Sequence, residues 1–232
     1  KVEEEKIAVK GGDTLSRTLH YTHRGPVISR FKDVDDRTLS MRWIGMEYSN
    51  ELRAVYLLNQ ASNWKEFKEA VSSFTSISQN IAYADIHGNI GMYCCAGIPI
   101  REGDPEMILP GDTSLYDWKG LVPFGELPHQ YNPEDGMVSS ANNRTADPDY
   151  PYYISHWYDL APRIDRIREM LSAKHKLTVE DFQEIQTDQR SLMVDIFKKK
   201  IVHHVSQNKR LSDEEQQALN LLNRWNGGYS KG

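Results

Sequence analysis

Hydrophobic and polar positions near the N-terminus follow the pattern of β-strands, whereas those in the last third follow a helical period. Three segments rich in β-formers predict strands over Val2–Val9, Thr18–Ser29 and Thr38–Tyr48. We expect a turn at Asp35–Asp36 between the last two. Residues 1–62 are therefore predicted to be rich in strands.

Two apolar runs in the middle part of the chain, residues 63–150, flank the turn sequence His87–Gly88–Asn89. Apolar runs on either side of a glycine turn predict a β-hairpin, here over 80–85 and 90–95. The following stretch, Gly97–Asp135, is dense in proline and glycine and predicts a long irregular loop. A short strand is expected after it, over Met137–Ser140.

Polar residues that cap helices precede most of the helical patterns, and the part from 151 to 232 is predicted to be helical. The predicted capping residues, in chain order, are Asn50, Asn63, Asp159, Thr178 and Ser212. Pro162 suits the first turn of the helix after Asp159. One more helix is expected over Leu192–Val205. Strands first and helices afterwards predict an α+β fold.

Composition excludes several classes of protein. The chain has 232 residues and a formal net charge of −5, which argues against a nucleic-acid-binding protein. No apolar run approaches the roughly 20 residues of a membrane-spanning helix. Cys94 and Cys95 are adjacent, so we expect two small buried hydrophobic residues and neither a disulfide framework nor a metal site.

Several catalytic motifs are absent from the sequence: Gly-x-Ser-x-Gly, His-Glu-x-x-His, the Walker loop and the dinucleotide fingerprint. His20 and His23 lie an odd number of residues apart in a predicted strand, so they face opposite sides and cannot share a metal. The acidic residues of Asp147–Asp149 match no calcium loop motif and are interpreted as solvated turn formers.

Asn142 and Asn143 are the first candidates for chemistry. Asparagine tolerates unusual backbone angles, so a simple turn is one interpretation of the pair. The other is functional, because an amide at the end of a strand can donate a hydrogen bond to a developing oxyanion. Such a donor lowers the barrier by about 2.7–4 kcal/mol.

Arg163 is the second candidate. It lies near the start of its predicted helix, where the macrodipole disfavours a cation by roughly 0.3–1 kcal/mol. Helix stability therefore does not explain this arginine, and an ion pair with Asp159 or Asp165 is the alternative to a functional role.

Neighbouring aromatic residues could line an apolar pocket or simply belong to the core. They are Tyr150, Tyr152, Tyr153, Trp157 and Tyr158.

Ordered motifs from about Asn63 to Gly228 resemble the penicillin acylase family. They are Tyr83–Asp85 with Gly88–Gly91, Ile98–Arg101, Pro110–Gly111, Trp118–Phe124, Tyr131–Pro133, Asn142–Asn143, Tyr150–Pro151, Trp157, Arg163–Ile164 and Leu222–Gly227. The resemblance of residues 1–62 is looser. Three positions depart from the family pattern: Arg144 follows the asparagine pair, Asn226 replaces an aspartate, and Ile154 falls near a calcium-binding carboxylate.

The resemblance implies an N-terminal-nucleophile hydrolase with a four-layer αββα core, of which 1–232 would be one fragment of the β chain. It implies that a serine freed by autocleavage attacks an amide, with its own α-amino group as base. Carried over by position, Asn142 would hold the oxyanion and Arg163 would orient polar groups around it. No cofactor is expected, and calcium in the parent is left open because of Ile154.

The expected function is hydrolysis of an amide between an acyl group and an amine. Substrates that the resemblance suggests are β-lactams with aryl-acetyl side chains, acyl-homoserine lactones and other N-acyl compounds. The expected partners are an upstream β-chain segment with the nucleophile, an α chain and the small-molecule substrate. A rival hypothesis is a non-catalytic domain that binds peptide or carbohydrate through its tyrosine-rich surface.

Three further expectations follow from the interpretation as a fragment. The serine would lie upstream of Lys1, so the chain alone should not turn over a phenylacetyl amide. Strands cut from a larger sheet would leave open edges, so the chain should self-associate with concentration. The family suggests a periplasmic or extracellular location.

Overall fold

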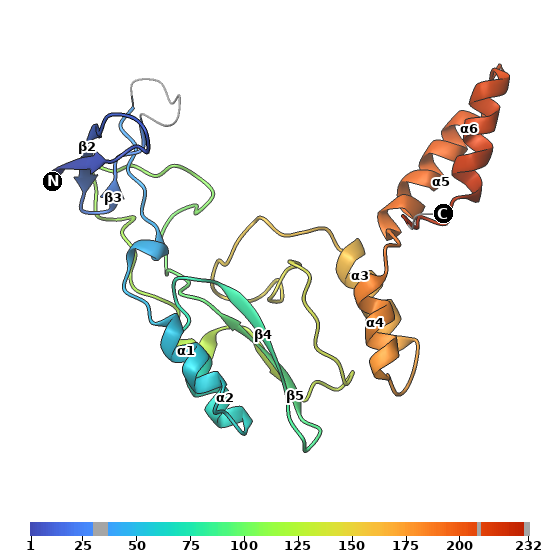
Figure 1. Cartoon of the computed structure of the whole chain (residues 1–232), viewed down its shortest axis with the longest axis horizontal. Coiled ribbons are helices and arrows are strands. Elements are labelled where there is room, and N and C mark those ends of the chain that lie inside the picture. Colours follow the sequence, from blue (N-terminus) through green and yellow to red (C-terminus); the bar gives the residue numbers. More distant parts are fainter. Residues whose placement is uncertain (30–36, 208–209, 230–232) are drawn as a thin grey trace. The chain divides into compact units, whose positions relative to one another are not determined.

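The computed structural model describes residues 1–29, 37–207 and 210–229, and it contains both helices and antiparallel sheets (Figure 1). The fold is α+β, as predicted. The chain forms two compact units. The first comprises residues 1–133 and 146–156, and the second comprises 134–145 and the part from Trp157 onward.

The first sheet of unit one has three antiparallel strands, β1 (Val2–Ile7), β2 (Leu15–Thr22) and β3 (Gly25–Pro26). The first two form a hairpin, and the register pairs Val2 with His20. The predicted strand over Val2–Val9 is thus confirmed, whereas that over Thr18–Ser29 is divided by a turn. Gly25 in this turn has φ +136°, and a Cβ there would lie 2.1 Å from the Met41 carbonyl oxygen. The chain can turn this tightly only with glycine.

The predicted strand over Thr38–Tyr48 is wrong. Among the described residues, only Ser40 of this segment pairs with a strand-like partner, in an isolated bridge to Val27, and a short 3₁₀ helix, η2 (Ile44–Met46), follows. The propensity of β-formers depends on a neighbouring strand that continues the ladder, and here the ladder stops after one pair. The predicted turn at Asp35–Asp36 lies outside the described residues.

Two short helices follow, and their predicted caps are confirmed. Asn50 precedes α1 (Glu51–Leu58), and its Oδ1 accepts a hydrogen bond from Arg53 N at 3.0 Å. Asn63 precedes α2 (Trp64–Val71) in the same way, with a bond from Glu66 N at 3.1 Å. Each cap satisfies an amide that the first turn of a helix leaves without a partner.

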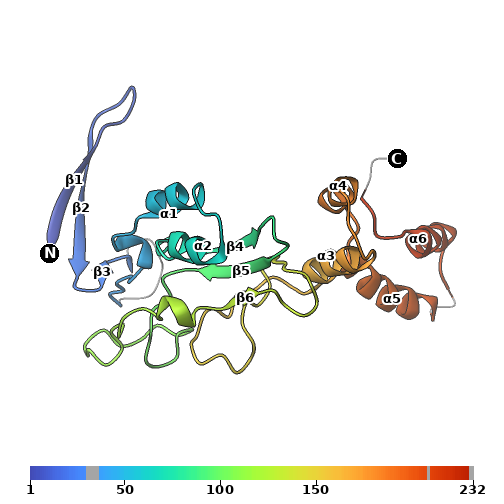
Figure 2. The ribbon, with the colours of Figure 1, turned by 90° about the horizontal axis from the view of Figure 1, so that it is seen from below.

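The predicted hairpin forms the second sheet. Strands β4 (Gln79–Ala84) and β5 (Ile90–Cys95) pair antiparallel, and β6 (His129–Tyr131) adds a third strand beside β5 (Figure 2). β6 and the 3₁₀ helix η3 (Phe124–Glu126) are the regular elements within the predicted loop Gly97–Asp135.

The core of unit one lies between α2 and this hairpin. Its buried members are Phe67, Val71, Tyr93, Cys95, Ala96, Ile98, Val122 and Leu127. Cys94 and Cys95 are both buried and free, as expected. Burial raises the pKa of the Cys95 thiol to about 12, so this residue behaves as a hydrophobic core residue.

The second unit contains four helices: α3 (Pro162–Ser172), α4 (Val179–Thr187), α5 (Leu192–Ser206) and α6 (Asp213–Arg224). The last two lie side by side (Figure 1). Thr178 and Ser212 form capping boxes with Asp181 and Glu215, which confirms both predicted starts. None of the described helices is long and apolar enough to cross a bilayer.

Two predictions in the second unit are wrong. Met137–Ser140 is not a strand, because no neighbouring strand pairs with it within the described part of the chain. Asp159 does not cap α3, since the capping position is taken by Ala161. Pro162 does lie at the start of α3, as predicted, and the side chain of Asp159 makes other contacts.

We expect Phe67→Ala to destabilise unit one by about 3–5 kcal/mol, because it deletes a large side chain from a packed core. Phe67 is 3% exposed and stacks on Trp64 with ring centroids 5.0 Å apart. Native-state hydrogen exchange of the β4 and β5 amides measures the loss. Tyr56→Ala is the control, because Tyr56 is 64% exposed and its loss should change stability by less than about 0.5 kcal/mol. Equal effects of the two changes would contradict this description of the core.

Candidate functional site

A tight turn before α3 presents the first candidate residue. Asn142 has φ +60°, a left-handed conformation that asparagine tolerates better than most residues. Ala141 before it is buried, whereas Asn142 is exposed. Asn143 is used by the turn itself: its Oδ1 accepts from Ala141 N at 3.0 Å, and its Nδ2 donates to Arg144 O at 3.0 Å. Only the first asparagine of the pair therefore presents its amide outward.

Arg163 meets this turn from the first turn of α3. Its Nη1 donates to the Asn142 side-chain Oδ1 at 3.1 Å and to the Ala141 carbonyl at 3.3 Å. A guanidinium has only donors, so the oxygen of the Asn142 amide must face the arginine. The NH₂ group then points away from it, and no hydrogen bond joins Nδ2 to any residue that the structure describes. The arrangement leaves one oriented amide donor open.

Asp159 is the third member of this arrangement. Its Oδ2 accepts a hydrogen bond from Arg163 Nη1, and its backbone N–H donates to the Asn142 carbonyl at 2.8 Å. The bond from Arg163, together with that from the Leu160 amide, holds the pKa of the Asp159 carboxyl below its usual range. Pairing of Arg163 with Asp159 was one of the two alternatives from the sequence. The structure combines that pairing with the contact to Asn142.

From the sequence, Asp159 is predicted only as a helix cap and as a partner of Arg163. Its backbone hydrogen bond to Asn142 could not be predicted from the sequence, because the two residues are separated by a long irregular segment of the chain. The spacing of four residues between Asp159 and Arg163 does favour an ion pair, and it was the one local clue.

A cavity of about 620 Å³ adjoins Asp159 and Arg163 in the second unit. Its charged residues are largely neutralised, since Arg166 donates two hydrogen bonds to Asp188, each 2.9 Å long. These bonds lower the pKa of Asp188. Much of the remaining lining is apolar: Leu160, Pro162, Ile167, Met170, Ile185, Leu192 and Met193.

The candidate aromatic residues differ in their contacts and in their exposure to solvent. Tyr150 and Tyr152 both donate to Glu126, and Tyr152 also packs against the core of unit one. The Tyr153 ring lies under the guanidinium of Arg101, with 5.3 Å between that group and the ring centroid. The core interpretation therefore describes Tyr152 well. Trp157 in the second unit is 85% exposed.

The calcium position implied by the resemblance does not fit a metal ligand in this chain. Ile154, which falls near the expected carboxylate, is partly buried and packs against the core cluster of unit one. An isoleucine side chain has no oxygen to offer calcium. Among residues 1–29, 37–207 and 210–229, no cluster of three or more His, Cys, Asp or Glu side chains could hold a metal ion.

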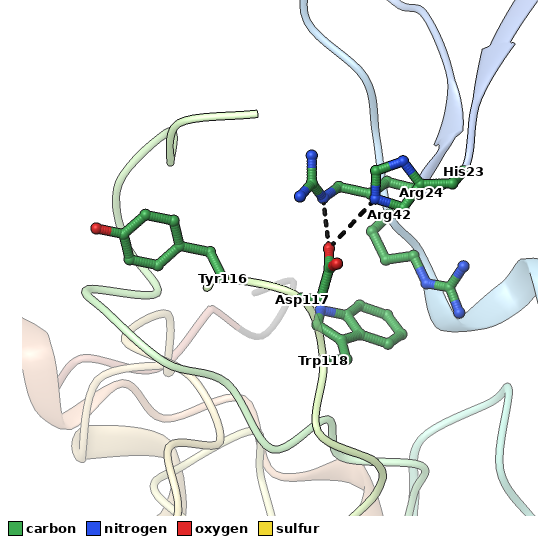
Figure 3. Close-up of a pocket in the computed structure, with 6 residues that line it drawn as sticks. All are labelled: His23, Arg24, Arg42, Tyr116, Asp117 and Trp118. Carbon is green, nitrogen blue, oxygen red and sulfur yellow. Dashed lines mark hydrogen bonds and ion pairs between the residues drawn. The ribbon is translucent and has the colours of Figure 1, made fainter. Parts of the chain in front are cut away.

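A second, smaller cavity of about 210 Å³ lies in unit one (Figure 3). Arg24 donates through Nε to Asp117 at 2.6 Å and through Nη1 to the Gly111 carbonyl at 2.6 Å, and Nη2 bonds the Thr113 carbonyl. The hydrogen bond from Arg24 Nε lowers the pKa of the Asp117 carboxyl. Through these three bonds Arg24 fastens the loop 111–117 to the turn after β2.

Arg163→Gln should raise the pKa of Asp159 towards the ordinary value of about 3.9, because the arginine is the main cause of its lowered pKa. In the native protein this carboxylate favours folding at pH above its unfolded pKa, and the contribution disappears as the pH falls through the folded pKa. An NMR titration of the side-chain carboxyl carbons measures the change. Asp188, whose pKa is lowered by Arg166, is the control and should not move. An unchanged Asp159 would contradict the assigned contact.

Comparisons with known proteins identify the family to which the chain belongs. A family model for penicillin amidase matches residues 1–232. The chain is 30% identical to penicillin G acylase of Escherichia coli, over 97% of this chain and 27% of that protein. It is 26% identical to the acyl-homoserine lactone acylase QuiP of Pseudomonas aeruginosa, over 82% of this chain and 24% of that protein.

A solved structure of a thermostable penicillin G acylase from Alcaligenes faecalis superimposes with a TM-score of 0.74 and 25% identity. The match covers 100% of this chain and 42% of the solved one, so the chain spans less than half the length of these relatives. The resemblance noted in the sequence motifs is thereby confirmed, and with it the N-terminal-nucleophile hydrolase fold. This chain belongs to the penicillin amidase family.

Proposed function

We propose that this chain is the part of an amide-hydrolysing acylase that stabilises the oxyanion of the reaction. The observation that carries the proposal is the orientation of Asn142: Arg163 holds its oxygen at 3.1 Å, and its exposed NH₂ is left to donate. Membership of the penicillin amidase family supports an amidase-type activity for the whole enzyme. The names of the relatives, penicillin acylases and acyl-homoserine lactone acylases, support the same reaction class.

In the proposed reaction, a serine from another segment of the mature enzyme attacks the carbonyl carbon of an N-acyl substrate. Its hydroxyl proton passes to the serine's own α-amino group as the bond from Oγ to carbon forms. The carbonyl oxygen becomes an oxyanion, and Asn142 Nδ2 donates a hydrogen bond to it. Since charge develops on that oxygen only during the reaction, the donor binds the transition state better than the substrate.

Collapse of the tetrahedral intermediate breaks the bond from carbon to nitrogen, and the proton held by the α-amino group passes to the leaving amine. The acyl group stays on the serine, and water then hydrolyses this ester by the same steps. Arg163 carries no proton in this scheme. It keeps the amide of Asn142 in one orientation, because its hydrogen bond would be lost if the amide turned over.

Two substrate classes are candidates. Relatives named as penicillin G acylases and as an acyl-homoserine lactone acylase reach 30% and 26% identity, respectively. The two classes are distinguished by comparing the rates at which the mature enzyme hydrolyses a phenylacetyl amide and an N-acyl homoserine lactone. Release of the amine measures both rates. We place phenylacetyl amides first because the relative at 30% identity is a penicillin G acylase.

We expect removal of the Asn142 amide to lower kcat about 10²- to 10³-fold in the mature enzyme, with a much smaller change in KM. Asn142→Gly is the sharper variant, because glycine accepts φ +60° without strain and carries no donor. Asn142→Ala should lose as much activity, with a further small loss of stability from the left-handed backbone.

Asn223→Ala is the matched control, since Asn223 lies exposed on α6 in the same unit. It should leave kcat unchanged. Circular dichroism checks that each variant is folded. If Asn142→Gly turned over substrate at the native rate, the oxyanion role would be excluded and a binding role for this chain would gain support.

A further inference from the structure

Asp159 touches both members of the proposed oxyanion site, and it does so through different atoms. Its backbone N–H donates to the Asn142 carbonyl at 2.8 Å, and its carboxylate pairs with Arg163. A third bond, from the Leu160 amide to Oδ1 at 3.0 Å, fixes the carboxylate itself. One residue therefore ties the turn that carries the amide donor to the helix that carries the arginine.

The side-chain contact matters because Arg163 has few other restraints. Its side chain is 59% exposed, and a long exposed side chain has many rotamers to choose from. Its remaining described hydrogen bonds go to two neutral oxygens, on Ala141 and Asn142. Bonds to a carboxylate are stronger and shorter than bonds to neutral oxygens. The carboxylate is thus the main anchor that keeps Nη1 beside the amide.

The backbone contact acts on Asn142 directly. A left-handed residue directs its carbonyl differently from its neighbours, and the bond from Asp159 N occupies that carbonyl. Rotation of the peptide unit would break this bond and move the side chain that starts from the same Cα. Asp159 therefore restrains both parts of Asn142. Its backbone N–H holds the backbone carbonyl directly, and its carboxylate holds the side chain indirectly, through Arg163.

We propose that Asp159 is a positioning residue for amide hydrolysis, which sets the direction of the Asn142 amide by fixing Arg163. The proposal rests on the proposed function of Asn142. Asp159 itself contacts no substrate and transfers no proton in this scheme. Its carboxylate acts only through the arginine, so its effect on the rate must vanish when the Asn142 amide is removed.

A double-mutant cycle in the mature enzyme tests this dependence. Asp159→Asn keeps the size of the side chain and the backbone N–H but removes the charge that anchors Arg163. We expect kcat for a phenylacetyl amide to fall about 10- to 100-fold, since misplacement of a catalytic group by about 1 Å has effects of this size. In the Asn142→Gly background the same change should lower kcat less than about twofold, and KM should move little in both backgrounds.

Asp165→Asn is the matched control. Asp165 is an exposed acid in the first turn of the same helix and is not among the partners of Arg163. It should leave kcat unchanged, whereas Asp159→Glu, which restores the charge, should recover part of the lost rate. If Asp159→Asn does not fold, Asp159→Ala, which also removes the carboxylate and keeps the backbone N–H, takes its place in the cycle.

The outcomes separate the two proposals. Equal falls in both backgrounds, or no fall with Asp159→Asn while Asn142→Gly is slow, would overturn the positioning role and leave the oxyanion role intact. Native turnover by Asn142→Gly would overturn the oxyanion role first, and the positioning role with it.

Discussion

One guanidinium nitrogen organises the candidate site. Nη1 of Arg163 faces the side-chain oxygen of Asn142, the carbonyl of Ala141 and the carboxylate of Asp159. Because arginine stays protonated and only donates, each of these oxygens has a fixed role as acceptor. The network leaves the amide nitrogen of Asn142 without a hydrogen-bond partner among the described residues, and the proposed chemistry depends on this donor.

The contact also closes a long excursion of the chain. Between Asn142 and Arg163, residues 146–156 belong to the first unit, whereas both ends belong to the second. Within unit one, Tyr150 and Tyr152 anchor the excursion through Glu126, and Ile154 packs against the core. Ordering such a segment costs conformational entropy, which buried apolar side chains and hydrogen bonds offset.

Ion pairs in the second unit contribute geometry more than stability. Arg166 is held by Asp188 and Arg190 by Asp195, as Arg163 is by Asp159. The more exposed pairs, those of Arg163 and Arg190, are worth about 0–1 kcal/mol each, because water screens the charges. What distinguishes Arg163 is that the pairing directs its remaining hydrogen bonds to the turn at Asn142. Without that turn beside it, Arg163 would form only a surface ion pair with Asp159.

Local elements with a clear signal were determined by the sequence alone. The caps at Asn50, Asn63, Thr178 and Ser212 and the hairpin around Gly88 depend on bonds within a few residues, so the residues themselves encode them. The strands predicted at Thr38–Tyr48 and Met137–Ser140 failed for the opposite reason. A strand exists only where another part of the chain supplies a continuous partner, and among the described residues the two segments have only the single bridge from Ser40 to Val27.

The candidate site, too, was predicted from the sequence in part and depends on the tertiary structure for the rest. The sequence singled out the asparagine pair and Arg163, partly by motif and partly because a cation at the start of a helix is unfavourable. The resemblance assigned the oxyanion role to Asn142 by position, but the sequence did not decide between Asp159 and Asp165 as partner of the arginine. Only the folded chain decided the partner of Arg163 and the direction of the Asn142 amide, because a side chain's direction depends on backbone angles such as φ +60° at Asn142 and on residues that are distant in sequence.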